Sequence, residues 1–460
     1  MEHYDLVIIG SGSGNSLVTP DFDDKRVAIV ERGTFGGTCL NVGCIPTKMF
    51  VYTADVAAAV ANAGRYNIDA TFRSVNWAKL RNRVFGRIDP ISQAGLDYRA
   101  SGANTTAILG QARFTGDRQL EVETPEDRLM HLSGDQVVVA AGAHPHIPAE
   151  IEASGVRYHT SDTIMRVPDL PRRVVIVGGG YIACEFAHIL HSLGSTVTVI
   201  VRGPAMMRHL DAELSTRFTQ IATRQWDVRL NTQVVKLTGG ANWVRVRSDD
   251  GDTIEADVLL VATGRHPNSA DLDLPRGGVA VHPDGRVVVD DFGRTSAAGV
   301  WALGDICSPY QLKHVANHEA RAVAHNLVHP DDLQPFNHTA VPYAVFTDPQ
   351  VASVGATEEQ LRAEGRRYVS YVQRYGDTAY GWAMEDQDSV CKVLADPQTH
   401  LLLGVHILGP QASTLIQPAI QAMALGQRVE DVARGQYWIH PALSEVLENA
   451  LLGLPLADPA

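Results

Sequence analysis

Cysteine is scarce in this chain, with five residues among 460. A small secreted fold stapled by disulfides carries a far higher share of cysteine, so a disulfide framework is excluded. A close pair among so few cysteines is more typical of redox chemistry or of a metal site. Cys39 and Cys44 form the one close pair in the sequence, which makes them the first candidates for a functional site.

Positive charge and long apolar runs are also lacking. The net charge is −13 and no basic run exceeds a few residues, which argues against nucleic acid as a partner. The N-terminus enters an apolar strand at Leu6–Ile9 without a basic leader, and we expect no apolar stretch of the ~18 residues that a membrane span needs. The sequence therefore predicts a soluble, cytoplasmic protein that acts on small molecules and has no membrane partner.

What the sequence does contain is one supersecondary unit, present twice. Each copy has a short apolar strand, a glycine-rich turn, a helix-compatible stretch and a second apolar strand, over residues 5–31 and 173–202. This is the pattern of a dinucleotide-binding βαβ unit. The 460 residues suffice for about three domains.

The remaining segments predict how the domains divide. Residues 51–98 are rich in alanine and predict helices, while residues 105–141 alternate like a β-meander, as a small insertion would. The strands predicted after residue 335 are 341–346, 368–372, 390–394 and 401–408, with helices after them. We therefore predict an α/β protein with two Rossmann-like dinucleotide-binding domains, at 1–150 with 265–335 and at 151–264, and a C-terminal α+β domain at 336–460.

The first glycine turn is Gly10-Ser11-Gly12-Ser13-Gly14-Asn15, after an apolar strand. Gly10 permits the tight turn, Gly12 lets the backbone approach a pyrophosphate, and a following helix would point its free N–H groups at that anion. Glu31, 21 residues beyond Gly10, is predicted to accept a hydrogen bond from a ribose. Asn15 stands at the third fingerprint glycine, which predicts looser packing of helix on strand.

The second glycine turn, Gly178-Gly179-Gly180, predicts NADP rather than NAD. The strand after it ends in Arg202, where an NAD site has an acid. An arginine pairs with the 2′-phosphate of NADP, and Arg208 is near enough in sequence to close on the same phosphate. The competing interpretation is a pair of solvated surface arginines.

The cysteine pair lies in the run Gly36-Gly37-Thr38-Cys39-Leu40-Asn41-Val42-Gly43-Cys44-Ile45-Pro46-Thr47-Lys48. If this run starts a helix, about one and a half turns separate the two cysteines and their sulfurs can meet. The helix N-terminus and Lys48 would lower a thiolate pKa. A zinc site is the alternative, but it needs two more ligands, and the other cysteines stand alone at 184, 307 and 391.

In this order and over nearly the whole chain, these motifs resemble the pyridine nucleotide–disulfide oxidoreductase family of glutathione reductase and lipoamide dehydrogenase. The other matching landmarks are Ala262-Thr263-Gly264-Arg265, Gly304-Asp305, and His440-Pro441 with Glu445. The resemblance implies an enzyme, an NADPH-dependent disulfide reductase, with FAD in the first dinucleotide domain and NADPH in the second. It also implies a homodimer whose interface is the C-terminal domain.

The resemblance further implies roles at the redox centre. Cys44 would be the charge-transfer thiolate nearest the flavin, and Cys39 would be the thiol that attacks the substrate. Lys48 would lie near flavin N5 and pair with Glu185. In glutathione reductase a second lysine precedes this one, and here that position is Thr47.

More distant positions receive implied roles as well. Tyr181 resembles the aromatic gate over the nicotinamide pocket, Asp305 would bind the ribityl and phosphate part of FAD, and a helix from about His314 would direct its positive end at the flavin. His440, paired with Glu445, would be the general acid/base for the other subunit's site, and Pro441 favours a helix start that leaves His440 outside the helix. The remaining implied contacts are Ser13, Gly14, Gly37, Thr38, Ala112, Gly142 and Ala316 for FAD, and Gly178, Gly180, Ile182, Glu185 and Gly264 for NADPH.

Departures from the family pattern bear on the substrate. Arg202 counts against lipoamide dehydrogenase, which uses NAD. Pro20 cuts short the helix that offers cations to glutathione disulfide, and Asp21, Asp23 and Asp24 follow it. The sequence therefore favours a small disulfide that is polar but less anionic than glutathione disulfide. The alternatives are lipoamide dehydrogenase or a reductase of another low-molecular-weight disulfide, a redox-sensing flavoprotein without turnover, and an NADPH oxidase or quinone reductase that needs no cysteine pair.

Overall fold

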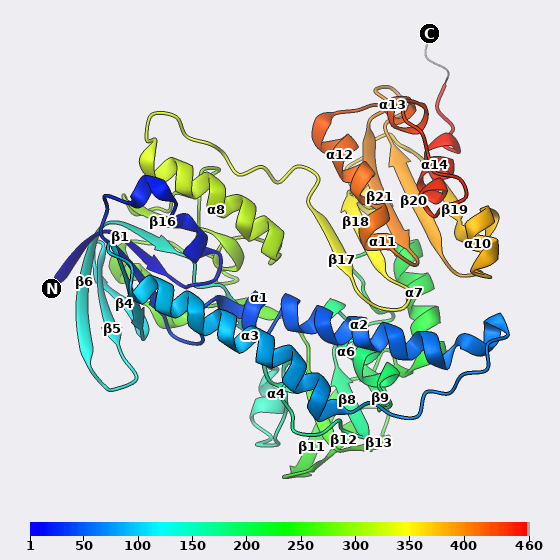
Figure 1. The fold of residues 1–460 in the computed structure, drawn as a ribbon, viewed down its shortest axis with the longest axis horizontal. Helices are drawn as coiled ribbons and strands as arrows, with labels where there is room; N and C mark the ends of the chain where they lie inside the picture. Colours follow the sequence, from blue (N-terminus) through cyan, green and yellow to red (C-terminus); the bar gives the residue numbers. More distant parts are fainter. Residues whose placement is uncertain (458–460) are drawn as a thin grey trace.

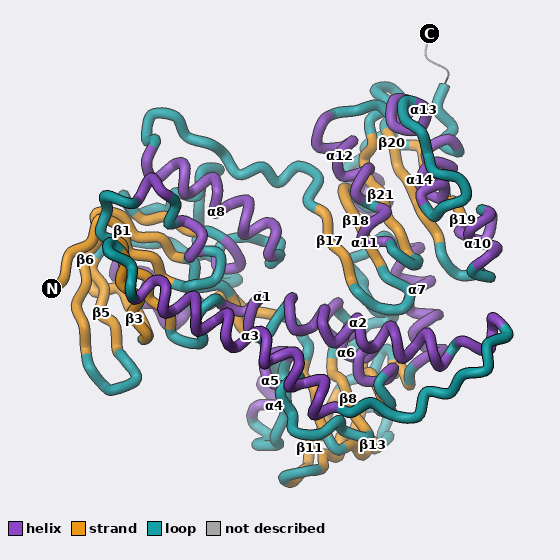
Figure 2. The backbone as a smooth tube through the Cα atoms, viewed as in Figure 1, coloured by secondary structure: helices purple, strands orange, loops and turns teal. Residues whose placement is uncertain are grey.

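The molecule has three groups of strands with long helices between them (Figures 1 and 2). The computed structural model describes residues 1–457, so the last three residues of the predicted third domain lie outside the described residues. Helices α1 (Gly37–Asn41) and α2 (Cys44–Ala61) carry the chain from the first group towards the other two, and α3 (Trp77–Ala100) brings it back to the first group. The predicted α/β fold class is confirmed.

The first sheet has a centre of apolar runs that are buried on both faces, at 6–9, 27–30 and 300–302. Its strands are β1 (Glu2–Ile9), β2 (Val27–Glu31), β3 (Thr105–Leu109), β4 (Gln111–Gly116), β5 (Gln119–Glu123), β6 (Leu129–Val139) and β16 (Val300–Ala302). The order is β3-β2-β1-β6-β5-β4, with β16 beside β6. β1, β2, β3, β6 and β16 pair in parallel, as doubly buried strands do. The predicted meander is right for β4 to β6 but wrong for β3, which extends the parallel sheet.

The α-helix predicted after the first glycine turn is wrong. Residues Gly14–Leu17 and Pro20–Phe22 form short 3₁₀ turns instead. Thr19 is extended, at φ −93° and ψ 174°, because a residue before proline avoids the helical region. Helix α8 (Lys313–Val328), from much later in the chain, lies against this turn.

The second sheet follows the predicted pattern more closely. It contains β8 (Arg173–Val177), β9 (Thr196–Ile200), β10 (Asp227–Arg229) and β14 (Val258–Val261), all parallel, in the order β10-β9-β8-β14. Helix α6 (Tyr181–Ser192) starts directly after the glycine turn, as predicted, and α7 (Ala212–Gln225) follows β9. The β insertion is the antiparallel set β11 (Val234–Gly240), β12 (Trp243–Ser248) and β13 (Thr253–Ala256).

Short elements join the first two groups. Strands β7 (Ala143–Pro145) and β15 (Arg265–Pro267) pair antiparallel where the chain passes between the groups. The helices α4 (Ala149–Glu152) and α5 (Ser161–Ile164) precede the second sheet.

The third group is an antiparallel sheet with the order β17-β18-β21-β20-β19. Its strands are β17 (Pro342–Val345), β18 (Val351–Gly355), β19 (Val369–Arg374), β20 (Val390–Ala395) and β21 (Leu402–Leu408). The sequence prediction lacks β18, because alanine, serine and glycine give its five residues a weak strand signal. The helices are α9 (Glu358–Ala363), α10 (Ala379–Ala383), α11 (Ala412–Leu415), α12 (Gln417–Leu425), α13 (Val429–Arg434) and α14 (Ser444–Leu452).

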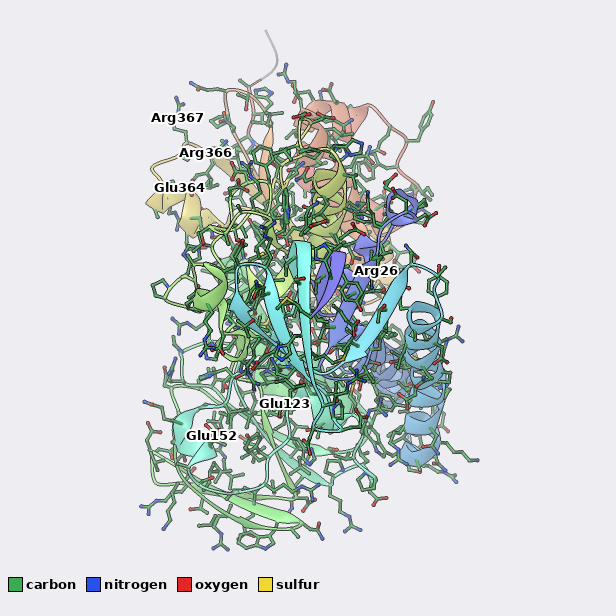
Figure 3. The ribbon with its side chains drawn as sticks, turned by 90° about the vertical axis from the view of Figure 1, so that its left-hand side faces the viewer. Arg26, Glu123, Glu152, Glu364, Arg366 and Arg367 are labelled. Carbon is green, nitrogen blue, oxygen red and sulfur yellow. The ribbon has the colours of Figure 1, made fainter. Side chains whose placement is uncertain are left out.

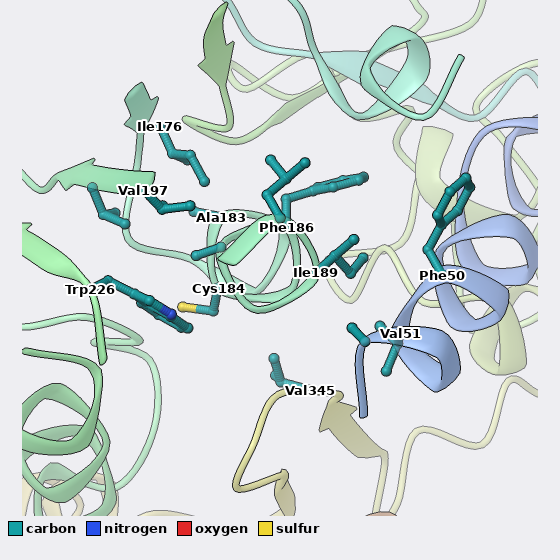
Figure 4. Close-up of a cluster of buried hydrophobic side chains, with 14 of the residues drawn as sticks. Phe50, Val51, Ile176, Ala183, Cys184, Phe186, Ile189, Val197, Trp226 and Val345 are labelled. Carbon is teal, nitrogen blue, oxygen red and sulfur yellow. The ribbon is translucent and has the colours of Figure 1, made fainter. Parts of the chain in front are cut away.

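One apolar core connects the second sheet, α2 and the third sheet. Figure 4 shows α6 at its centre, with Phe186 and Cys184 packed among side chains from several elements. Phe50 of α2, Val345 of β17 and Trp226 after α7 belong to the same buried cluster. Cys184 is therefore a small core residue, as a free cysteine commonly is.

Helix α2 also bears on the membrane prediction. The run Gly37–Ala61 meets the length and composition of a membrane span, so the expectation that no such stretch exists is wrong on that criterion. One such helix is weak evidence, because a core helix of a soluble protein passes the same test. Here Phe50, Val51 and Ala54 of α2 pack into the protein core.

Charged side chains lie at the outside of all three groups (Figure 3). The labelled residues are Arg26, Glu123, Glu152, Glu364, Arg366 and Arg367, and all are exposed. Charges of both signs are thus interspersed on the surface. These six residues do not form a single acidic or basic stripe.

Candidate active site

A cavity of about 1590 Å³ lies where the three groups meet. This exceeds the ~300–1000 Å³ of pockets for drug-sized ligands and suits extended dinucleotides. Both glycine turns, the cysteine run and the start of α8 line it. The predicted contacts on its wall are Gly10, Gly12, Ser13, Glu31, Gly37, Thr38, Cys39, Cys44, Lys48, Ala112, Gly142, Gly180, Tyr181, Ile182, Glu185, Asp305 and Ala316. Gly14, Gly178, Arg202, Arg208, Gly264, His440 and Glu445 are not among the lining residues.

The first glycine turn is held by close backbone contacts. Gly10 has φ +105°, and a Cβ there would lie 2.3 Å from the Ala140 carbonyl oxygen, so only glycine fits. The Ser11 amide and hydroxyl both donate to Glu31, at 2.9 and 2.7 Å, and the Gly36 amide donates to the Ser11 hydroxyl at 2.7 Å. Ser11 thus ties Glu31 to the start of the cysteine run.

The presence of asparagine at position 15 is explained by a contact that the motif alone does not reveal. Arg99 at the end of α3 donates to the Asn15 side-chain oxygen at 2.8 Å and to its carbonyl oxygen at 3.0 Å. A third fingerprint glycine would lack the first of these bonds. The fingerprint departure therefore anchors α3 to the turn. The predicted looser packing of a helix on the strand does not arise, because the segment forms 3₁₀ turns.

The cysteine run does not form one continuous helix, contrary to the prediction. Cys39 lies in α1 and Cys44 begins α2, with a break at Val42-Gly43. A Cβ on Gly43 would lie 2.9 Å from the Thr38 carbonyl oxygen, so the break requires glycine. Thr47, at the position of the missing lysine, is buried and donates to the Gly43 carbonyl oxygen at 2.7 Å. The Thr47 side chain therefore stabilises the break between α1 and α2. It brings no charge to the cavity, unlike a lysine at this position.

The two thiols are close enough to share a proton. Their mutual hydrogen bond lowers the pKa of Cys44 to about 7, helped by Lys48 and opposed by burial. The same bond raises the pKa of Cys39 far above its usual range, and burial adds to this. In the dithiol state the proton therefore rests on Cys39 and the negative charge on Cys44. The contribution of Lys48 agrees with the prediction, whereas the larger contribution of Cys39 was not predicted.

Lys48 and Glu185 are paired as predicted. The ammonium lies 2.6 Å from both carboxylate oxygens, and the Glu185 side chain is buried. The Phe346 amide donates to the same carboxylate at 3.0 Å, and the Phe346 ring lies 4.5 Å from the Lys48 nitrogen. Phe346, in the loop after β17, thus completes a site that α2 and α6 build. The sequence analysis did not predict a role for Phe346.

Arg202 and Arg208 are the two arginines that follow the second glycine turn in the sequence. Both Arg202 and Arg208 are exposed. A Cβ on Gly203 would lie 2.9 Å from Arg208 Cδ and Nη1, so the Arg208 side chain folds over the backbone next to Arg202. Within residues 1–457 neither arginine forms an ion pair. A guanidinium group can pair with a phosphate, and both arginines have theirs free to do so.

The start of α8 contributes a residue that the sequence analysis missed. Lys313 is the first residue of the helix, and its ammonium donates to the Ser13 hydroxyl at 2.8 Å. Its charge also opposes the rise in the pKa of Cys39. Asp305 lines the same region, and burial raises the pKa of its carboxyl while Arg265 opposes this. No motif marks Lys313, because the fold alone brings it to the first glycine turn.

His440 and Glu445 form the predicted pair, away from the cavity of their own chain. His440 Nδ1 lies 2.7 Å from a Glu445 oxygen, and the histidine side chain is 72% exposed. The helix expected to start at Pro441 begins at Ser444 instead, because residues 440–443 form a turn. The histidine does lie outside the helix, as predicted. A ring so exposed on one chain is free to enter a site formed with a second chain.

Metal binding finds no support in the part of the chain that the structure describes. There, no group of three or more histidine, cysteine or acidic residues is arranged to hold a metal ion. Cys184, Cys307 and Cys391 are all buried and free, and burial raises the pKa of each.

Comparison with known proteins identifies relatives over the full length. Residues 4–320 match the pyridine nucleotide-disulphide oxidoreductase family, and residues 341–451 match the dimerisation domain of that family. The chain is 53% identical to mycothione reductase of Mycobacterium tuberculosis, over 99% of this chain and 100% of the relative. It is 31% identical to glutathione reductase of Burkholderia cepacia, over 96% and 97% of the two chains. The HOCl-induced flavoprotein disulfide reductase RclA of Escherichia coli, solved as a Cu(II) complex, superposes with a TM-score of 0.87 at 28% identity, over 98% and 99% of the chains.

Proposed function

Because this chain belongs to the pyridine nucleotide-disulphide oxidoreductase family, we propose that it reduces mycothione, the disulfide of mycothiol, with NADPH. The enzyme is an FAD-containing oxidoreductase that uses NAD(P)H. The 53% identity to a mycothione reductase over 99% of the chain is the observation that supports mycothione as the substrate. The runs at 10–16, 34–50 and 440–450 carry the same resemblance in the sequence.

The cavity fits both cofactors. Gly10 has no room for a Cβ beside the Ala140 carbonyl oxygen, as the tight turn of a dinucleotide fingerprint requires. We assign FAD to the first glycine turn with Glu31, Ala112, Gly142, Asp305 and Ala316 around it. We assign NADPH to the second turn with Tyr181, Arg202 and Arg208, which two free guanidinium groups support. Accordingly, residues 1–150 with 265–335 would form the FAD domain, 151–264 the NADPH domain and 336–460 the interface domain.

The thiols carry the substrate half of the reaction. When bound, FAD and NADPH supply the hydride chemistry that delivers two electrons to the Cys39–Cys44 disulfide. The Cys39 sulfur then attacks mycothione, breaking its S–S bond, forming a mixed disulfide and releasing one mycothiol. The Cys44 thiolate attacks the Cys39 sulfur, which releases the second mycothiol and restores the disulfide. Ping-pong kinetics follow.

A base is needed because the proton of the reduced pair rests on Cys39. His440 is the candidate: Glu445 holds its Nδ1 at 2.7 Å, which leaves Nε2 free to take the Cys39 proton and return it to the departing mycothiol thiolate. Since His440 is exposed and lies off the cavity of its own chain, we propose that it serves the site of the partner in a homodimer. The match to a dimerisation domain supports a homodimer. We further propose that the dimer is soluble and cytoplasmic.

Steady-state oxidation of NADPH tests this function. The purified holoenzyme is assayed with mycothione, glutathione disulfide and lipoamide side by side, and NADH replaces NADPH as a control. Selective turnover of mycothione with NADPH supports the proposal. Turnover of lipoamide with NADH would instead make the enzyme a lipoamide dehydrogenase, the alternative that the family leaves open.

A further inference from the structure

A lysine is buried between the second and third groups of strands. Lys392 lies on β20 with 4% of its side chain exposed, 2.9 Å from Asp211 Oδ1 and 2.6 Å from Glu358 Oε2. The Asp211 side chain is fully buried. Burying such charges is costly unless they are paired and hydrogen-bonded. Their retention inside the protein therefore points to a specific geometric role.

The same residues cap two helices from different parts of the chain. Asp211 accepts from the Glu213 amide of its own helix α7 and from the Glu358 amide of α9, both at 3.1 Å. In return, Glu359 accepts from the Ala212 amide at 3.3 Å. The starts of α7 and α9 are therefore held face to face, with Lys392 paired to both Asp211 and Glu358 between them.

Both partners stay charged in this cluster. Burial alone would raise the pKa of Asp211, but hydrogen bonds from Lys392 and from the Glu358 amide outweigh it and the pKa falls. Burial likewise would lower the pKa of Lys392, and its bonds to Glu358 and Asp211 raise it instead. The cluster of Lys392, Asp211 and Glu358, called the lock below, is therefore held by charged groups.

The lock lies at the end of the loop that carries Arg208. The Met207 amide donates to the Gly179 carbonyl oxygen at 2.7 Å, which fixes the loop to the second glycine turn. Asp211 fixes it four residues later. Arg208 therefore projects from the five-residue span 207–211, which is anchored at both ends. Next to it, His209 lines the large cavity opposite Gln360 of α9, so both locked elements contribute to the cavity wall.

We propose that Lys392 is a positioning residue for NADPH specificity: through Asp211 and Glu358 it holds the loop that presents Arg208 to the 2′-phosphate. Lys392 does not touch the nucleotide, and it acts from a strand 181 residues away from Asp211. The inference rests on the proposed role of Arg208 in binding NADPH.

Binding of two nucleotide fragments to the holoenzyme tests the proposal. Isothermal titration calorimetry measures adenosine 2′,5′-bisphosphate, which has the 2′-phosphate, and adenosine 5′-monophosphate, which lacks it. In Lys392→Met the Kd of the bisphosphate is expected to rise about tenfold, as for the loss of one charge-assisted hydrogen bond, with the monophosphate unchanged. The KM for NADPH rises in step, and kcat at saturating NADPH stays within about twofold.

Three further variants separate the possible outcomes. Glu430→Gln removes the ion pair of Glu430 with Arg428 in the same group of strands, away from the loop, and leaves both Kd values unchanged. Arg208→Ala tests the proposed function itself, and an unchanged bisphosphate Kd in that variant would overturn the assignment of the 2′-phosphate site. The double variant Lys392→Met with Arg208→Ala is expected to equal Arg208→Ala alone, since Lys392 acts through Arg208.

Glu358→Gln keeps the test decisive if Lys392→Met does not fold. Glu358 is more exposed than Lys392, and the amide variant keeps its shape while losing its charge. A selective rise in the bisphosphate Kd in either variant supports the proposal. If Arg208→Ala loses discrimination while both lock variants retain it, or if they weaken both fragments equally, the positioning role is wrong and the proposed function stands.

Discussion

The Lys48 ammonium lies 2.6 Å from both carboxylate oxygens of Glu185, and this pair joins the helix that begins at Cys44 to the helix that begins at Tyr181. The two helices thus fix Cys44 and Tyr181 relative to each other. The Phe346 amide, bonded to the same carboxylate, adds the third group of strands to the arrangement. The starts of α2 and α6 and the loop after β17 are therefore held together at this carboxylate.

Replacing Lys48 by methionine removes the cation while keeping the length of the side chain. Glu185 is then a buried carboxylate without its partner, which is unfavourable. We expect reduction of the bound flavin by NADPH to slow about 100-fold, as for the loss of one preorganised charge at a reacting centre. Rapid-mixing measurements of flavin bleaching give the rate, and Lys236→Met on the surface strand β11 is the control. An unchanged rate would show that the ion pair only supports the fold.

The thiol pair predicts a specific pH dependence. In the reduced enzyme Cys44 titrates near pH 7, because its hydrogen bond with Cys39 lowers its pKa to about 7. Cys44 is therefore mainly thiolate above pH 7 and protonated below it. In Cys39→Ala the largest lowering cause is gone, so the pH midpoint for alkylation of Cys44 moves upward. Mass spectrometry of the alkylated peptide across a pH series measures this, and a midpoint that stays near 7 would assign the effect to Lys48 instead.

The proposed role of His440 in the partner's site predicts complementation between two inactive variants. His440→Ala is expected to lower turnover about 100-fold or more by removing the general acid/base, with reduction by NADPH unaffected. Cys39→Ser accepts electrons from NADPH but reduces no disulfide. Half of the dimers formed on random mixing are heterodimers with one intact site of two, so activity returns to about one quarter of wild type. Mixtures that stay inactive after subunit exchange would mean that His440 serves its own chain.

Gly203 provides a test of the arginine pair that leaves both arginines in place. A Cβ at this position would lie 2.9 Å from Arg208 Cδ and Nη1, so Gly203→Ala displaces the guanidinium. We expect the KM for NADPH to rise about fivefold, equivalent to ~1 kcal/mol, with the KM for NADH unchanged. Equal changes for both nucleotides would indicate a general distortion of the loop.

Local signals in the sequence are sufficient for the motifs that carry the chemistry. The glycine turns, the cysteine run and the His440–Glu445 pair are each short in sequence, and their spacing limits their geometry. Pairing of Lys48 with Glu185 follows from the family resemblance, since 137 residues separate the two. These expectations agree with the distances in the structure.

Contacts between distant segments are what the sequence cannot supply. Arg99 donates a hydrogen bond to the Asn15 side-chain oxygen, which accounts for the departure from the fingerprint. Lys313 donates to the Ser13 hydroxyl, although 300 residues separate the two. The α-helix expected after the first turn is replaced by 3₁₀ turns, since Pro20 stops it and α8 takes the adjacent place. Local propensity had no information about either partner.

Differential alkylation of the cysteines tests the central claim most directly. The holoenzyme is labelled anaerobically before NADPH, after one equivalent of NADPH, and after mycothione is then added, and each cysteine is quantified by mass spectrometry. The buried Cys184, Cys307 and Cys391 are internal controls that stay unlabelled. We expect Cys39 and Cys44 to be protected at first, labelled after NADPH and protected again after mycothione. Turnover of mycothione with no change in the labelling of Cys39 and Cys44 would contradict the account.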